Sequence, residues 1–113
     1  MSDDVNLSMT DLADVAGLVE VTPDSTVSRT VLKAEGARVV LFSFDAGQEL
    51  TEHTAAVPVL LQALDGRFEI TAAGRTTTLG PGDLIHLGTR TPHAVVAVEP
   101  GRLLLTMLDP RQS

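Results

Sequence analysis

The chain has 113 residues, a length that suits one domain with a modest hydrophobic core. It contains no cysteine, which excludes disulfides and thiolate chemistry. Its formal net charge of −7 argues against binding to nucleic acid or anionic membranes, since both require clustered positive charge. No apolar run is long enough to span a bilayer, and the first residues, "MSDDVNLSMT", lack the pattern of a secretory signal, so we expect a cytoplasmic protein.

The N-terminal region carries most of the negative charge. Residues 1–20 contain five acidic residues and no lysine or arginine, so the rest of the chain, with ten acidic and eight basic residues, has a net charge of only −2. The five are Asp3, Asp4, Asp11, Asp14 and Glu20. We therefore predict a solvated acidic arm over residues 1–20 and one barrel domain over residues 21–113. Within the arm, residues 8–18 predict a short helix capped by Ser8 or Thr10.

Beyond the arm, short apolar runs alternate with turn-forming residues. The predicted strands lie in two runs around Glu35-Gly36 within residues 27–44, at 57–64, in two runs around Gly74 within residues 67–79, and at 84–88, 93–98 and 102–108. These are about eight short strands, separated by turns at intervals of roughly 8–12 residues, with no helices between them. The pattern predicts an all-β fold, an antiparallel jelly-roll barrel with an interior filled by Val and Leu.

Two of the predicted strands are apolar on both faces, residues 57–64, "VPVLLQAL", and residues 102–108, "RLLLTML". A small barrel buries only one face of each strand, so the second face needs a cover. A two-fold copy of the same chain is the commonest cover, and we therefore predict a homodimer. With only three aromatic residues the chain offers no base-stacking surface, and we expect no nucleic-acid partner.

One stretch of the sequence resembles the first motif of the cupin superfamily, G-x5-H-x-H-x3–4-E-x6-G. Gly47, His53 and Gly66 match this motif. Its second histidine falls on Ala55 and its glutamate on Val59. The resemblance implies a cupin barrel with an incomplete set of the usual ligands.

A later stretch resembles the second cupin motif, G-x5-P-x-G-x2-H-x3-N. Gly82 and His93 match, whereas the proline falls on Gly88, the glycine on Arg90 and the asparagine on Ala97. The resemblance implies that the matching histidines of the two motifs lie on neighbouring strands and point into the same cavity.

A narrower resemblance covers residues 28–107 and is to small bacterial single-domain cupins of unassigned function. In that group alanine is usual at the place of Ala55, and a glutamine stands at the place of Gln62. The chain departs from the group at Pro58, where an acid is usual, and at His86, where an aliphatic residue is usual. The resemblance implies that the absence of the second histidine is a feature of this group.

His53 and His93 stand where cupins place histidine ligands, and we predict that they bind a divalent transition metal. Neutral imidazoles suit Zn, Fe, Ni, Cu or Mn, although a stable site usually has a third protein ligand. The alternative is a pair of histidines hydrogen-bonded inside a polar pocket that holds no metal.

Three further residues are candidates for the pocket or for the third ligand. Gln62 matches the narrower group, although it alternates with Leu61 and Ala63 and so faces away from the motif's glutamate position. His86 would replace the missing histidine if its strand face lies in the cavity, and Glu49 would supply a carboxylate. The alternatives are a sheet-surface or subunit contact for Gln62, a buried or interface histidine for His86, and a solvated strand edge for Glu49.

Two classes of function are compatible with these residues. The first is a metal-dependent enzyme that acts on a small polar organic molecule, with the metal as a Lewis acid or as a site for O₂. The second is a metal-free protein, either a small-molecule-binding module or a barrel whose dimer surface matters more than its cavity. The sequence contains no nucleophile elbow, phosphate-binding loop or dinucleotide fingerprint, so it does not indicate a particular reaction.

Overall fold

A short 3-10 helix and nine β-strands form the part of the chain that the computed structural model describes, residues 7–109. The helix is η1 (Val15–Leu18), and the strands are β1 (Thr26–Ala34), β2 (Ala37–Phe44), β3 (Glu49–His53), β4 (Val59–Ala63), β5 (Arg67–Ala72), β6 (Arg75–Leu79), β7 (Leu84–Leu87), β8 (His93–Glu99) and β9 (Gly101–Leu108). Asp3 and Asp4 of the predicted arm lie outside the described residues. Within residues 7–109 no helix is long and apolar enough to cross a membrane.

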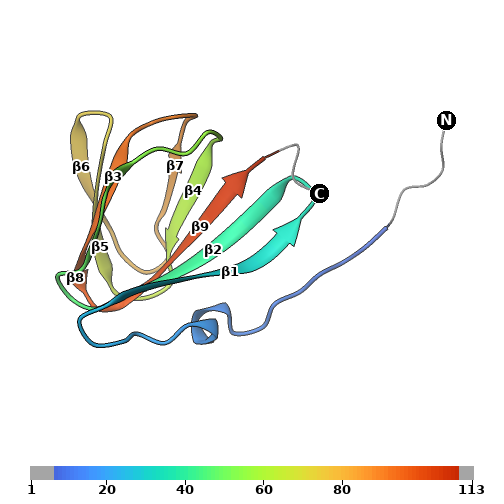
Figure 1. Ribbon diagram of the computed structural model, residues 1–113, viewed down its shortest axis with the longest axis horizontal. Coiled ribbons are helices and arrows are strands. Elements are labelled where there is room, and N and C mark those ends of the chain that lie inside the picture. Colours follow the sequence, from blue (N-terminus) through green and yellow to red (C-terminus); the bar gives the residue numbers. More distant parts are fainter. Residues whose placement is uncertain (1–6, 110–113) are drawn as a thin grey trace.

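The strands form two antiparallel sheets that face each other (Figure 1). The larger sheet has the order β1-β2-β9-β4-β7 and the smaller sheet the order β3-β8-β5-β6. The predicted all-β, antiparallel jelly-roll barrel is thus confirmed. Strand β3 adds to the eight predicted runs. Its sequence, "ELTEH", has a single apolar residue and no alternation, so it takes its strand form from pairing with β8.

Most buried apolar side chains lie between the two sheets. Phe44 of β2 and Phe68 of β5 come from opposite sheets and meet edge to face, with ring centroids 5.3 Å apart. Both side chains are fully buried, and they pack in one cluster with Leu61, Ile70 and Leu103. Burial of a side chain of this size contributes roughly 1.5–3 kcal/mol to folding. The part of the barrel around these five side chains is therefore closed by apolar packing, and we call it the packed half.

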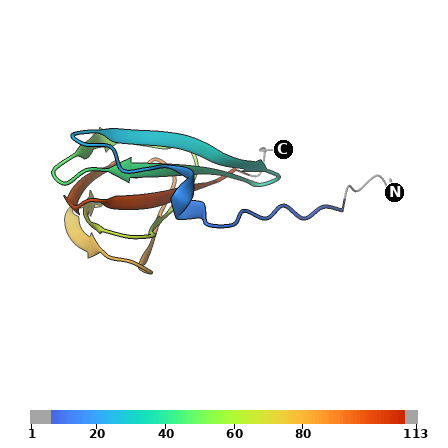
Figure 2. The same cartoon turned by 90° about the horizontal axis from the view of Figure 1, so that it is seen from below.

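The N-terminal segment covers part of the outer face of the larger sheet. Leu41 alternates with the inward-facing Val40 and Phe42, yet it is fully buried. Val19, which precedes β1, is buried as well. Figure 2 shows η1 lying across the outer side of β2 and β9. The chain itself thus supplies part of the cover for the second apolar face, while residues 7–14 are exposed.

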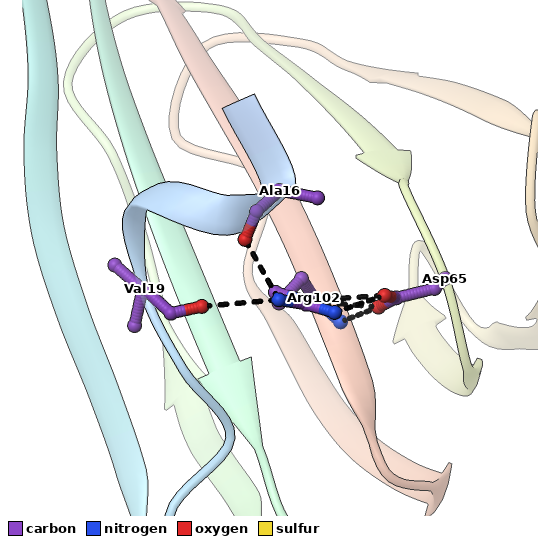
Figure 3. Close-up of polar contacts among 4 residues, drawn as sticks. All are labelled: Ala16, Val19, Asp65 and Arg102. Atoms are coloured by element: carbon purple, nitrogen blue, oxygen red, sulfur yellow. Dashed lines mark hydrogen bonds and ion pairs between the residues drawn. The ribbon is translucent and has the colours of Figure 1, made fainter. Parts of the chain in front are cut away.

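Arg102 of β9 holds this segment in place (Figure 3). Its Nη1 donates hydrogen bonds to the carbonyl oxygens of Ala16, at 2.9 Å, and Val19, at 3.3 Å. Its Nη2 donates to the carboxylate of Asp65 at 2.7 Å, and its backbone N–H donates to the same carboxylate at 2.6 Å. The hydrogen bond to Asp65 raises the pKa of the Arg102 guanidinium above its ordinary value, so the group stays charged. We call these four residues the arginine clamp.

The helix predicted over residues 8–18 reduces to the single 3-10 turn Val15–Leu18. Neither of the two predicted caps begins a helix, and Asp14, which precedes the turn with φ 49°, makes no capping hydrogen bond through its side chain. An isolated helix of this length is marginal in water. The carbonyl of Leu18 instead accepts a hydrogen bond from Arg29 Nη1 at 3.0 Å, so tertiary contacts replace the helical ones.

Gly66, the last glycine of the first motif, allows two turns to meet beside the arginine clamp. Its φ is 76°, and a Cβ on it would lie 2.6 Å from the carbonyl oxygen of Pro100 and 2.7 Å from the Cα of Gly101. Any larger residue would push these turns apart. The motif glycine is therefore required by a close approach of two backbones.

Candidate functional site

A β-bulge in β3 decides which side chain of that strand faces the barrel interior. Leu50 pairs with Val95 of β8, and both side chains pack with the core. Regular alternation would next bring Glu52 opposite His93, but the register shifts by one residue between Leu50 and His53. His53 therefore pairs with His93 and takes the inward-facing place that alternation would give to Glu52.

The two histidine rings lie against each other, with centroids 4.2 Å apart and planes inclined by 57°. Nδ1 of His53 lies 2.9 Å from the carbonyl oxygen of Thr51, and Nδ1 of His93 lies 3.0 Å from that of Thr91. A carbonyl oxygen only accepts hydrogen bonds, so in each neutral ring Nδ1 carries the proton. Each Nε2 is consequently left with a free lone pair.

His93 is held in its neutral form by burial. Its side chain is 1% exposed, and its Nε2 has no hydrogen-bond partner among the described residues. Desolvation lowers the pKa of His93 below the usual 6.5, the carbonyl of Thr91 opposes this by raising it, and the nearby charge of a protonated His53 lowers it further. At neutral pH the buried Nε2 is therefore an acceptor without a partner among the described residues.

Both histidines line a cavity of about 600 Å³. This volume falls within the range of small-molecule sites, roughly 300–1,000 Å³. Ala55 lines the same cavity, so the place of the motif's second histidine faces the site but carries only a methyl group. Val59, at the place of the motif's glutamate, is 1% exposed and belongs to the hydrophobic core. We call the part of the barrel around this cavity the cavity half.

The donor atoms present fit a two-histidine metal site. Histidines that bind metals commonly donate the other ring N–H to a backbone carbonyl, as both rings do here. Among residues 7–109, no group of three or more His, Cys, Asp or Glu side chains is placed to hold a metal ion. A metal bound by His53 and His93 would therefore leave its other positions to water or to a bound molecule.

Gln62, His86 and Glu49 do not line this cavity. Gln62 alternates with the buried Leu61 and lies on the outer face of β4. His86 is exposed on β7, where it borders a separate and much smaller cleft. Glu49 precedes the bulge on β3 and is exposed on the outer face of the smaller sheet. In each case the two-residue alternation of the strand turns the side chain away from the barrel interior.

Arg38 lines the cavity, although no motif points to it. It shares the inner face of β2 with Val40 and Phe42, and all three border the cavity. Ser28 and Thr30 of β1 pair with Phe42 and Val40 and face the same space. Extending the alternation of Val40 and Phe42 back by one step would have placed Arg38 inside the barrel.

The chain is similar to known proteins over most of its length. The Cupin domain family model matches residues 40–108, more than half of the sequence. A conserved protein of unknown function from Streptococcus pyogenes is 30% identical, with a TM-score of 0.80 over 98% of this chain and 97% of that chain. A cupin superfamily protein from Desulfitobacterium hafniense is 23% identical, with a TM-score of 0.80 over 93% of this chain and 96% of that chain.

A third solved structure is KdgF from Halomonas sp., which is 28% identical, with a TM-score of 0.68 over 82% of this chain and 86% of that chain. No curated protein matches the sequence significantly. These likenesses extend over the whole barrel, so they concern its architecture as well as the two motifs.

Proposed function

The chain belongs to the cupin family, and we propose that its cavity holds a divalent transition metal, such as Zn, Ni, Mn or Fe, on His53 and His93. The observation that carries this proposal is the adjacent pair of imidazoles, each with Nδ1 engaged by a backbone carbonyl. Two Nε2 lone pairs remain, and the one on His93 is buried without a partner in the described part of the chain. A buried acceptor of this kind is unfavourable until a metal or a ligand satisfies it.

The proposed activity is that of a metal-dependent enzyme acting on a small polar organic molecule. A metal held there supplies Lewis acidity toward an oxygen atom of that molecule. The carbonyls of Thr51 and Thr91 fix the orientation and the tautomer of the two rings. Phe42 and Leu105 form apolar parts of the cavity wall beside the rings.

Metal uptake by untagged protein tests this proposal. We would compare the native protein with His53→Ala, His93→Ala and the double variant, at about pH 7.5, where imidazole is neutral. His86→Ala is the matched control, because His86 is exposed on β7 and does not line the cavity. We expect the native protein and the control to take up metal and gain thermal stability, and each cavity variant to bind at least roughly tenfold more weakly. Equal uptake by the native protein and the double variant would refute a metal site.

A metal-free binding protein is the second candidate. It is favoured by the absence, within residues 7–109, of a third donor side chain beside the two histidines. In this case the lone pair on His93 Nε2 accepts a hydrogen bond from the ligand. Calorimetry with a chelator separates the two functions. A metal-free binding protein still binds its ligand after metal is removed, whereas a metal-dependent site no longer binds the ligand.

We also propose that the protein is a homodimer in the cytoplasm, formed through the outer face of β4 and β7. Leu84 is 60% exposed on that face and pairs with Gln62, which is only half-buried. A second copy related by a two-fold axis would cover this strip. A cysteine-free chain also has no need of an oxidising compartment. We expect a dimer by sedimentation at micromolar concentration and a monomer for Leu84→Glu, and a monomeric native protein would contradict the proposal.

A further inference from the structure

We propose that Arg38 makes the cavity selective for small organic acids by binding the carboxylate of the ligand. The inference rests on the proposed function in one respect: it takes the same cavity as the ligand site and names the class of molecule that enters it. It does not depend on whether a metal is bound.

The position of Arg38 follows from the register of the larger sheet. Arg38 pairs with Met107 of β9, and both side chains line the cavity. On the other side of β2, the hairpin partner β1 contributes the hydroxyl groups of Ser28 and Thr30 to the same wall. A guanidinium group and two hydroxyl groups thus share one wall of a space that also contains the two histidines.

One nitrogen of the Arg38 guanidinium lacks a partner. Its Nε is buried and has no hydrogen-bond partner among residues 7–109. Within residues 7–109 the ion pairs join Arg67 to Glu99 and Arg102 to Asp65, and neither involves Arg38. A buried donor on a charged group is costly to leave unpaired. An acceptor brought by a ligand would satisfy it.

A carboxylate is the acceptor that suits this donor best. The planar fork of an arginine matches the two oxygens of a carboxylate and binds them through two parallel hydrogen bonds. Among the described residues that line the cavity, Arg38 is the one lysine or arginine and Asp109 the one aspartate or glutamate. A single guanidinium matches a ligand with one carboxylate better than a phosphate dianion.

The remaining wall indicates what kind of body the acid has. Val40, Phe42, Leu105 and Met107 are apolar and line the same space as Arg38. A cavity of about 600 Å³ leaves room for a carbon skeleton of modest size beside the carboxylate. The geometry therefore fits a small organic acid with an apolar or sparsely hydroxylated body.

Matched pairs of acids and amides test the assignment. Benzoate and benzamide, and hexanoate and hexanamide, have nearly the same shape within each pair and differ in charge. We would titrate each into metal-stripped protein and follow binding by ligand-observed NMR and calorimetry. For the native protein we expect the acids to bind at least about tenfold more tightly than the amides. No preference for the acids would overturn the inference.

Variants of Arg38 connect the preference to this side chain. Arg38→Met should bind acid and amide alike, and Arg38→Lys, which keeps the charge but loses the fork, should retain an intermediate preference. Arg75→Met is the matched control, because Arg75 is exposed on β6 and does not line this cavity. If Arg38→Met fails to fold by circular dichroism, Arg38→Gln takes its place. Retention of the native preference in the uncharged variant, Arg38→Met or Arg38→Gln, overturns the inference.

Metal uptake measured on the same proteins separates this inference from the proposed function. Arg38 supplies no metal donor, so Arg38→Met should take up metal as the native protein does. If metal uptake is absent while the preference for acids depends on Arg38, the metal site is refuted and the acid site stands. If metal uptake is normal and no preference for acids is found, the acid site alone is refuted.

Discussion

The packed half and the cavity half of the barrel differ in how their arginine side chains are paired. In the packed half, Arg102 of the arginine clamp is bonded to the carboxylate of Asp65 and to two backbone carbonyls. In the cavity half, Arg38 Nε and His93 Nε2 are buried and have no partner among the described residues. The hydroxyl groups of Thr26 and Ser43, beside Phe44 and Arg102, are also buried without a described partner, so the contrast concerns the arginine and histidine side chains. We therefore expect stability to depend mainly on the first region and the proposed binding on the second.

The largest expected effect comes from truncating the core of the packed half. Phe44→Ala should lower the free energy of unfolding by about 3–5 kcal/mol, because Phe44 is fully buried between the sheets and its removal leaves a cavity. Phe42→Ala, on the same face of β2 but lining the existing cavity, should cost about 1–2 kcal/mol. Urea unfolding of both variants checks the difference. Equal losses would show that the two halves are packed to the same degree.

A smaller effect is expected when the arginine clamp loses its carboxylate. Asp65→Ala leaves the guanidinium of Arg102 with backbone carbonyls only, and we expect a loss of about 1–3 kcal/mol in urea unfolding. Hydrogen exchange should also increase near Val19, because the N-terminal segment is held through Arg102. Unchanged exchange in that segment would mean that Arg102 does not anchor it.

The pH dependence of the metal-free protein probes the cavity half. Because the pKa of His93 in the folded protein is lowered, the unfolded chain binds this proton more tightly. The contribution of His93 to the free energy of unfolding is complete above the unfolded pKa of about 6.5. It is lost as the pH falls from there through the lower pKa of the folded protein. His93→Leu should remove this part of the decline between about pH 7.5 and 5.5 in urea unfolding. His86→Leu, which changes an exposed histidine, should leave it in place.

The smallest effect is expected at an exposed ion pair of the packed half. Arg67 and Glu99 lie 3.7 Å apart, with side chains 50% and 57% exposed. Arg67→Ala should therefore change the free energy of unfolding by no more than about 0.5 kcal/mol, and added salt should remove even that. A loss as large as that of Asp65→Ala would show that exposure does not distinguish the two pairs.

Much of the fold could be predicted because local patterns carry it. The alternation of Val40, Phe42 and Phe44 with Leu41 and Ser43 predicts β2 and both of its faces, and the turn residues around it predict the hairpin with β1. The predicted hairpin over residues 67–79 is confirmed for the same reason, since β5 and β6 reverse next to Gly74.

The remaining features could not be predicted because they join distant parts of the chain. The arginine clamp joins Ala16, Asp65 and Arg102, and no local pattern marks any of them as partners. The bulge that turns His53 inward arises from pairing with β8, and nothing within "ELTEH" specifies it. The two histidines were predictable as a pair from the motifs, whereas their contact depends on this irregular pairing.

Because of the bulge in β3, the position of His53 in the site depends on the number of residues between Gly47 and His53. Gly47 donates its N–H to the carbonyl of Ala97 at 2.8 Å, and Gln48 accepts a hydrogen bond from the N–H of Ala97, so this end of β3 is aligned with β8. From Gln48 to His53, β3 uses one residue more than β8 uses from Ala97 back to His93. Deletion of one residue in this stretch would regularise the strand yet keep the histidines opposite each other, whereas insertion of one would require a second irregularity to do so. Natural variation in the length of this segment should therefore favour shortening over lengthening.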